Sequence, residues 1–102
     1  MQIKTKIVNI TSNSEVELLE ATTKTIIKSL SIVLKDETDI KTINLYVKDW
    51  SSSAVYLYKK AVSKDGIYLN DLFLETWKKV SIESPDLWSG EQIDVILQYI
   101  EL

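Results

Sequence analysis

The apolar residues between Val16 and Leu34 constrain the fold of this chain more than any other part of the sequence. They recur at spacings of three and four residues, as one face of an α-helix requires: Val16, Leu19, Thr23, Ile26, Ile27, Leu30, Val33 and Leu34. Ser14 and Glu17 have the spacing of a capping box, which starts a helix. The pattern therefore predicts an amphipathic helix over residues 14–34.

Strict alternation of apolar and polar residues predicts strands in other segments. Residues 2–10 alternate and are rich in β-branched side chains, which is typical of a strand. Residues 40–49 and 54–62 also alternate, and a short polar segment that begins at Trp50 joins them. Two such runs with a short connection predict a β-hairpin.

Two further segments complete the expected order. Asn70 can cap a second helix that Pro85 ends, and Trp77 lies on the apolar side of that helix, where we expect it in the core. Residues 91–102 fit a helix or a strand, and we favour the strand because a fourth strand better covers the long first helix. The order is then β-α-β-β-α-β, the ferredoxin-like arrangement, with two helices on one face of an antiparallel sheet. A final helix would leave an α+β sandwich with three strands. We therefore predict a single α+β domain over residues 1–102.

The chain has no histidine, no cysteine and no arginine, which narrows the possible chemistry. Without histidine and cysteine, the Ser-His-Asp and Cys-His arrangements cannot occur. The two glycines form no phosphate-binding loop. Acids crowd a loop at Asp36, Glu37 and Asp39, but they lack the spacing of a calcium loop, and a surface loop is the favoured interpretation. We predict no catalytic residue, no metal site and no cofactor.

Charge is distributed unevenly along the chain. The net charge is −3, but residues 1–64 hold ten lysines against seven acids, and residues 65–102 hold two lysines against eight acids. After Lys79 there are five acids and no base. Such asymmetry can steer association with a basic partner, although a solvated acidic surface would have the same composition. The negative charge and the missing arginine argue against nucleic-acid binding.

Acidic and aromatic side chains are the candidate partner-binding residues. Tryptophan and tyrosine are typical anchors of interfaces. Trp88, which follows a turn, either anchors a partner or folds back over the core. On the hairpin, a three-residue loop places Tyr46 opposite Tyr58, and a four-residue loop places it opposite Leu57. The candidates are Glu83, Asp86, Glu91 and Asp94 as charged groups, with Trp88, Trp50, Tyr46, Tyr56 and Tyr58 as aromatic groups.

These observations predict a small non-enzymatic protein that binds another, basic protein. The most concrete version is an inhibitor or immunity protein that neutralises a basic toxin, such as a nuclease, through acidic and aromatic groups. The alternative is a structural or self-associating subunit, for instance a homodimer through an open sheet face. A third possibility is a small enzyme that uses carboxylates and Mg²⁺. No segment has the roughly 18 apolar residues of a membrane span, and no secretory signal is recognisable, so we expect a cytoplasmic protein that does not bind membranes.

Overall fold

Eight β-strands, and no helix, make up the part of the chain that the structure describes. The computed structural model describes the backbone of residues 2–35, 41–49, 54–62 and 67–102, and their side chains except those of residues 54–62 and 67–69. The strands are β1 (Lys4–Ile10), β2 (Val16–Glu20), β3 (Thr25–Lys35), β4 (Lys41–Lys48), β5 (Ala54–Val62), β6 (Ile67–Leu74), β7 (Lys79–Glu83) and β8 (Gln92–Glu101).

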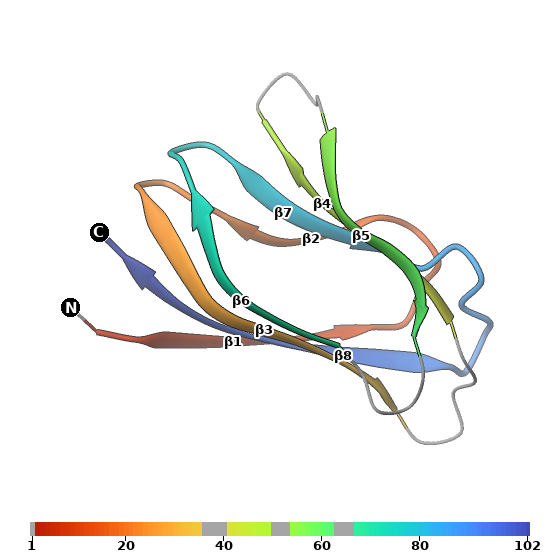
Figure 1. Ribbon diagram of the computed structural model, residues 1–102. Helices are drawn as coiled ribbons and strands as arrows, with labels where there is room; N and C mark the ends of the chain where they lie inside the picture. Colours follow the sequence, from red (N-terminus) through yellow and green to blue (C-terminus); the bar gives the residue numbers. More distant parts are fainter. Residues whose placement is uncertain (1, 36–40, 50–53, 63–66) are drawn as a thin grey trace.

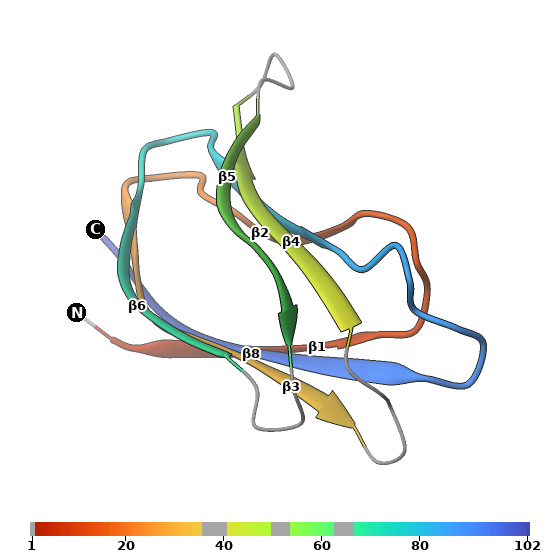
Figure 2. The ribbon, with the colours of Figure 1, turned by 45° about the vertical axis from the view of Figure 1, so that its right-hand side comes forward.

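The strands form two antiparallel sheets that pack face to face (Figures 1 and 2). Sheet A has the strand order β1-β8-β3-β6, and sheet B has the order β2-β7-β4-β5. Apart from the β4–β5 hairpin, each step along the chain crosses from one sheet to the other. This order is that of a jelly roll, in which two Greek keys close into a sandwich. The chain ends lie together at one end of the sandwich, and the connection between β7 and β8 lies at the other (Figure 1).

The core lies between the two sheets and is made of alternate residues from each strand. In the central strand β8, Ile93, Val95 and Leu97 are fully buried, whereas the residues between them are not. Ile43 and Leu45 of β4 meet them from sheet B within one apolar cluster. Each fully buried aliphatic side chain stabilises the fold by about 1.5–3 kcal/mol. The core therefore needs no disulfide or metal to hold it.

The predicted helix over residues 14–34 is wrong, because this segment forms β2, a turn and β3. The register of β3 against β8 shifts between Ile27 and Ser29, which marks a β-bulge at Lys28. The bulge places Ile27 and Leu30, three residues apart, on the same inner face. A second bulge, at Leu18, interrupts the alternation of β2 in the same way. In these two strands the bulges therefore give the apolar residues the three- and four-residue spacing that is typical of a helix.

The second predicted helix is also wrong, since the segment forms β6, a tight turn and β7. Phe73 lies on the outside and Leu74 in the core, as neighbours on a strand must. Trp77 is not a core residue: it lies in the turn, its side chain is 56% exposed and its φ is +71°. Pro85 ends no helix, because it lies in the loop after β7. The α+β class and the ferredoxin-like order are thus contradicted by an all-β fold.

All four predicted strands are confirmed. Residues 2–10 contain β1, the last segment forms β8, and β4 pairs with β5 as an antiparallel hairpin. The hairpin register agrees with neither expected alignment: Tyr46 lies opposite Tyr56, and a bulge then places Tyr58 opposite Leu45. The expected acidic loop at residues 36–39 and the polar segment that begins at Trp50 lie outside the described residues.

The folded chain is compact, with a radius of gyration of 13.2 Å, close to the roughly 13 Å usual for 100 residues. None of the described segments is a helix of the length and hydropathy needed to cross a membrane.

Candidate functional site

Two consecutive turns shape the connection between β7 and β8, which we call the Trp88 loop (residues 84–91). The N–H of Leu87 donates to the Ser84 carbonyl, which closes the first turn with Pro85 at its second position, where the fixed φ of proline fits. The N–H of Glu91 donates to the Trp88 carbonyl and closes the second turn. Gly90 has a φ of +88° at the third position of that turn, where glycine is the residue without steric cost.

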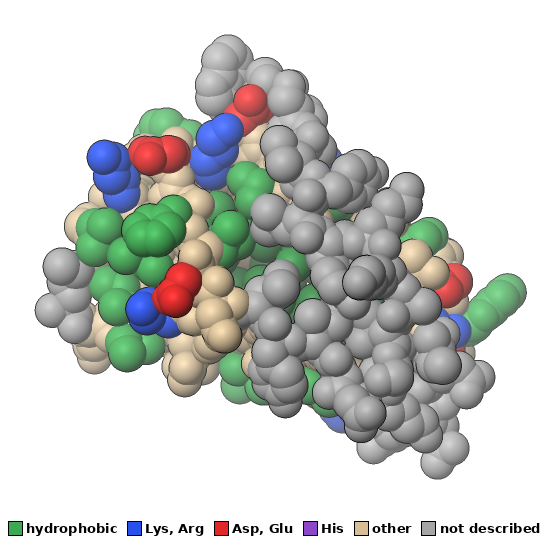
Figure 3. Space-filling view, viewed as in Figure 1, with side chains coloured by type: hydrophobic (Ala, Val, Ile, Leu, Met, Phe, Trp, Pro, Cys, Tyr) green, Lys and Arg blue, Asp and Glu red, His purple; other side chains and the backbone are tan. Residues whose placement is uncertain are grey.

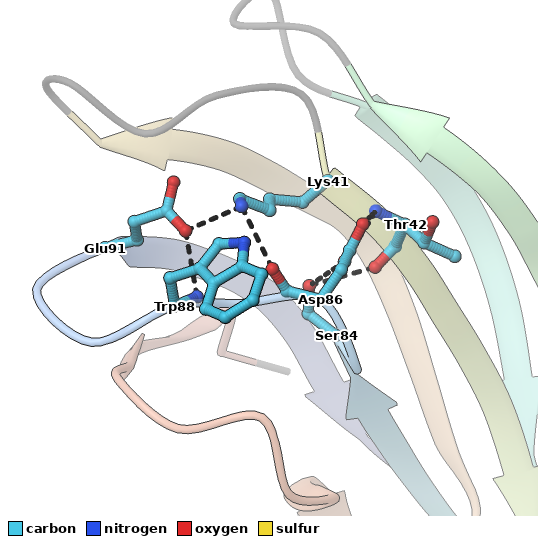
Figure 4. Close-up of polar contacts among 6 residues, drawn as sticks. All are labelled: Lys41, Thr42, Ser84, Asp86, Trp88 and Glu91. Atoms are coloured by element: carbon cyan, nitrogen blue, oxygen red, sulfur yellow. Dashed lines mark hydrogen bonds and ion pairs between the residues drawn. The ribbon is translucent and has the colours of Figure 1, made fainter.

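A buried lysine fastens this loop to sheet B. Lys41 begins β4, and only 4% of its surface is exposed. Its Nζ lies 2.6 Å from Oε1 of Glu91 and donates to the carbonyl of Asp86 at 2.9 Å (Figure 4). Oε1 of Glu91 also accepts the backbone N–H of Trp88, at 2.8 Å. A buried charge is tolerated when it is paired and hydrogen-bonded, and both conditions hold here.

The carboxylate of Asp86 makes a second attachment to the start of β4. The backbone N–H of Thr42 donates to both carboxylate oxygens of Asp86, each at 3.0 Å (Figure 4). The hydroxyl of Ser84 donates to the Thr42 carbonyl at 2.9 Å. These bonds satisfy backbone groups at the strand end that a buried position would otherwise leave unpaired. The Trp88 loop is therefore tied to β4 from both of its turns.

Trp88 is the large side chain that this rigid loop presents to solvent. Its neighbour Leu87 is only 5% exposed and packs in the core, whereas Trp88 is 71% exposed. Trp88 therefore does not fold back over the core. An indole held on an ordered loop loses little conformational freedom on binding, and tryptophan is the residue type most enriched in binding hot spots. The arrangement is suited to contact with another molecule.

The four predicted acids do not form one patch. Asp86 and Glu91 lie in the Trp88 loop, whereas Glu83 is on β7 of sheet B and Asp94 on β8 of sheet A. Each is already engaged with the protein: Glu83 accepts the side-chain amide of Asn44 at 3.3 Å, and Asp94 accepts that of Asn9 at 2.9 Å. The loop brings Asp86, Trp88 and Glu91 together; the other two acids lie apart from it.

The predicted aromatic surface on the hairpin is only partly described. Tyr46 is 5% exposed, so it offers a partner little surface. The side chains of Tyr56 and Tyr58, and all of Trp50, lie outside the described residues. Next to Tyr46, the amide oxygen of Asn44 is buried and has no hydrogen-bond partner among the described residues.

A polar cluster lies on the outside of sheet B and consists of Glu15, Tyr46, Lys48 and Ser81. Nζ of Lys48 lies 2.6 Å from Oε1 of Glu15. The hydrogen bond from Lys48 is the main cause that lowers the pKa of Glu15 from its usual value of 4.5; partial burial opposes it, and hydrogen bonds from Tyr46 and Ser81 add to it. Because the folded-state pKa is lowered, Glu15 stabilises the fold above its ordinary pKa, and this contribution is lost as the pH falls through the lowered value.

Replacing Glu15 with glutamine should therefore weaken the fold at pH 7 but not in acid. We expect a loss of less than about 1 kcal/mol at pH 7, because about a third of the side chain is solvated, and the difference should vanish as the pH falls from the ordinary pKa of 4.5 through the lowered pKa of Glu15. Urea unfolding across this range measures it. Glu75→Gln, in the exposed β6–β7 turn, is the control. A difference that stays constant with pH would contradict the assignment.

Sequence reasoning missed Lys41, Thr42 and Ser84. A signal for Lys41 was present: it is in phase with Ile43 and Leu45, so alternation places a lysine on the inner side of β4. A lysine on a core face requires an acid nearby, and the sequence after Lys79 is rich in acids. No comparable signal existed for Thr42 or Ser84, because their contacts depend on the path of the loop.

Among the described residues, no group of three acids lies close enough together to hold a metal ion. No protein-family model matches the sequence, and no curated protein has significant sequence similarity to it.

Proposed function

We propose that this protein is a non-enzymatic binding module that contacts a basic protein partner through Trp88. The observation that carries the proposal is a 71% exposed tryptophan on a loop that a buried ion pair and several hydrogen bonds fix to the core. Binding residues are commonly placed on loops that a rigid scaffold positions. Fixing the loop before binding reduces the entropic cost of association.

The expected chemistry of the partner follows from the surroundings of the indole. A lysine or arginine can lie over the face of an indole and gain a cation–π interaction. Asp86 adds negative charge beside it, while the charge of Glu91 is balanced by Lys41. The net charge of −3 favours encounter with a basic protein.

The narrower prediction, an inhibitor of a basic toxin, rests on charge placement along the sequence. The protein itself already engages Glu83, Asp86, Glu91 and Asp94 in hydrogen bonds, so the acidic groups are the weaker part of that prediction and Trp88 is the stronger part. A cytoplasmic location is part of this proposal, because no secretory signal and no membrane-spanning segment is recognisable in the sequence.

Photocrosslinking from position 89 in the cells that make the protein tests this proposal. A benzophenone amino acid replaces Ser89, the exposed neighbour of Trp88, in one variant and Ser12, which is exposed in another loop, in the control, so that Trp88 is kept in both. We expect a discrete adduct with one basic protein from position 89 only. The purified partner should then bind Trp88→Ala at least about 30-fold more weakly than wild type, and bind Trp77→Ala normally.

Two results would overturn the proposal. One is the lack of any adduct specific to position 89. The other is an identified partner that is acidic, or that binds Trp88→Ala as tightly as wild type.

A further inference from the structure

The outward faces of the two sheets differ in charge. On the outside of sheet B, Lys79 lies 3.5 Å from both Glu17 and Glu20, and Lys48 pairs with Glu15. The outward residues of sheet A, which we call the A face, are the alternate residues that the core does not bury. Six of those that the structure describes are apolar: Ile7, Ile26, Val33, Phe73, Ile96 and Ile100.

The charged groups of the A face are few and balance one another. Lys28 and Asp71 form an ion pair at 2.9 Å at the bulge. Asp94 accepts a hydrogen bond from Asn9, and Lys35 lies at the end of β3. Two lysines and two aspartates give these described positions a net charge of zero. Most other outward positions are serine, threonine, asparagine or glutamine.

The register arranges these side chains in rows across the strands. Phe73, Ile26 and Ile100 lie side by side in one apolar row. The next row is polar and contains Ser29 and Gln98, whose side chains are hydrogen-bonded at 3.2 Å. Beyond it, Ile7 lies opposite Ile96 in a row that also contains Ser31. When two sheets pack about 10 Å apart, the apolar rows of one sheet can fit between the apolar rows of the other.

Several of these apolar side chains are unusually exposed. Phe73 is 71% and Ile7 is 68% exposed, at opposite edges of the sheet. Figure 3 shows hydrophobic side chains gathered at the surface over the end of the molecule where β3 begins and β6 ends. Exposed apolar rows on a face whose few charges balance one another are suited to an interface.

We propose that the A face packs against the A face of a second copy of this chain. A charged partner would find no complementary charge here, whereas two copies bring together surfaces of zero net charge. Four strands about 4.8 Å apart, each contributing about seven residues of about 3.3 Å, give roughly 440 Å² per copy. The total, about 900 Å², is below the roughly 1,200 Å² of stable specific interfaces, so the dimer is weak, with a dissociation constant of about 1–100 μM.

This proposal does not depend on the Trp88 loop. Trp88 lies at the opposite end of the sandwich from the chain ends, and outside the A face (Figures 1 and 4). Each copy in the dimer therefore keeps its own Trp88 accessible, and the two proposals can fail separately.

Sedimentation equilibrium of the purified full chain from about 1 to 500 μM tests the dimer. We expect a reversible monomer–dimer equilibrium. The double variant Ile7→Lys/Phe73→Lys should raise the dissociation constant at least about 30-fold, because it buries two charges in the interface. Gln98→Glu, which keeps the size of an exposed side chain, should raise it about 10-fold. Trp88→Lys is the matched control, since Trp88 is as exposed as Phe73, and it should leave the constant unchanged.

Circular dichroism and thermal unfolding confirm that each variant is folded. If the double variant is unstable, the single variant Gln98→Glu still tests whether the A face forms the dimer interface. A monomer throughout the concentration range would overturn the proposal. So would a dimer that the A-face variants leave intact, or one that Trp88→Lys weakens as strongly as they do.

Discussion

Replacing Lys41 with methionine is expected to lower the free energy of unfolding by about 2–4 kcal/mol, or the melting temperature by roughly 10–20 °C. Methionine keeps the length and the apolar stem of lysine but removes the charge. Glu91, whose side chain is only 16% exposed, then loses its ion pair, and the carbonyl of Asp86 loses a donor. Breaking a buried ion pair by removing one partner leaves an uncompensated charge, which costs much more than the pair contributes.

Lys79→Met is the matched control for this change. Lys79 also faces two glutamates, but at 3.5 Å and with 38% of its side chain exposed, so its removal should cost less than about 1 kcal/mol. Urea unfolding compares the two variants. The double variant Lys41→Met/Glu91→Gln should regain part of the loss, because it removes the unpaired charge. Equal losses in Lys41→Met and Lys79→Met would show that the pair does not hold the loop.

Replacing Ile32 with alanine should destabilise the protein by about 2–5 kcal/mol, whereas Val33→Ala should cost less than about 1 kcal/mol. Ile32 is fully buried between the sheets, and Val33 lies on the outside of the same strand. Both changes introduce the same weak strand former into β3, so the difference between them reports packing alone.

Comparing Ile32→Ala with Val33→Ala also distinguishes the strand β3 from the predicted helix over residues 14–34. In a helix over residues 14–34, Val33 belongs to the apolar stripe and Ile32 does not, which reverses the expected order. A larger loss in Val33→Ala than in Ile32→Ala, measured by urea unfolding, would contradict the strand register of β3.

The strand β1 could be assigned from the sequence, whereas the bulged strands β2 and β3 could not. Alternation is unbroken in β1, and it correctly predicted a strand there. In β3 the extra residue at Lys28 shifts the inner face by one position, so that Ile27 and Leu30 have helical spacing. The spacing of apolar residues alone does not distinguish such a shifted strand from an amphipathic helix. The threonines and isoleucines of this segment are the residues in the sequence that favour a strand.

The sequence indicated which segment holds the candidate site, but not which residues contact one another in it. Acids and an isolated tryptophan near a proline indicated the segment that contains Asp86, Trp88 and Glu91. Their partners, Lys41 and Thr42, lie more than forty residues earlier in the chain. Which lysine meets which acid depends on the crossing of β7 to β8 beside β4, and only the three-dimensional fold supplies that information.

The position of β8 has a consequence for the synthesis of the protein. Both β1 and β3 pair with this strand, and Lys4 lies opposite Tyr99 although 95 residues separate them. A nascent chain that has reached only residue 91 has no partner for β1 and lacks the strand that joins β1 to β3. Sheet A is therefore complete only after residues 92–101 leave the ribosome, and until then β1 and the edge of β3 that pairs with β8 stay open to pairing with other chains.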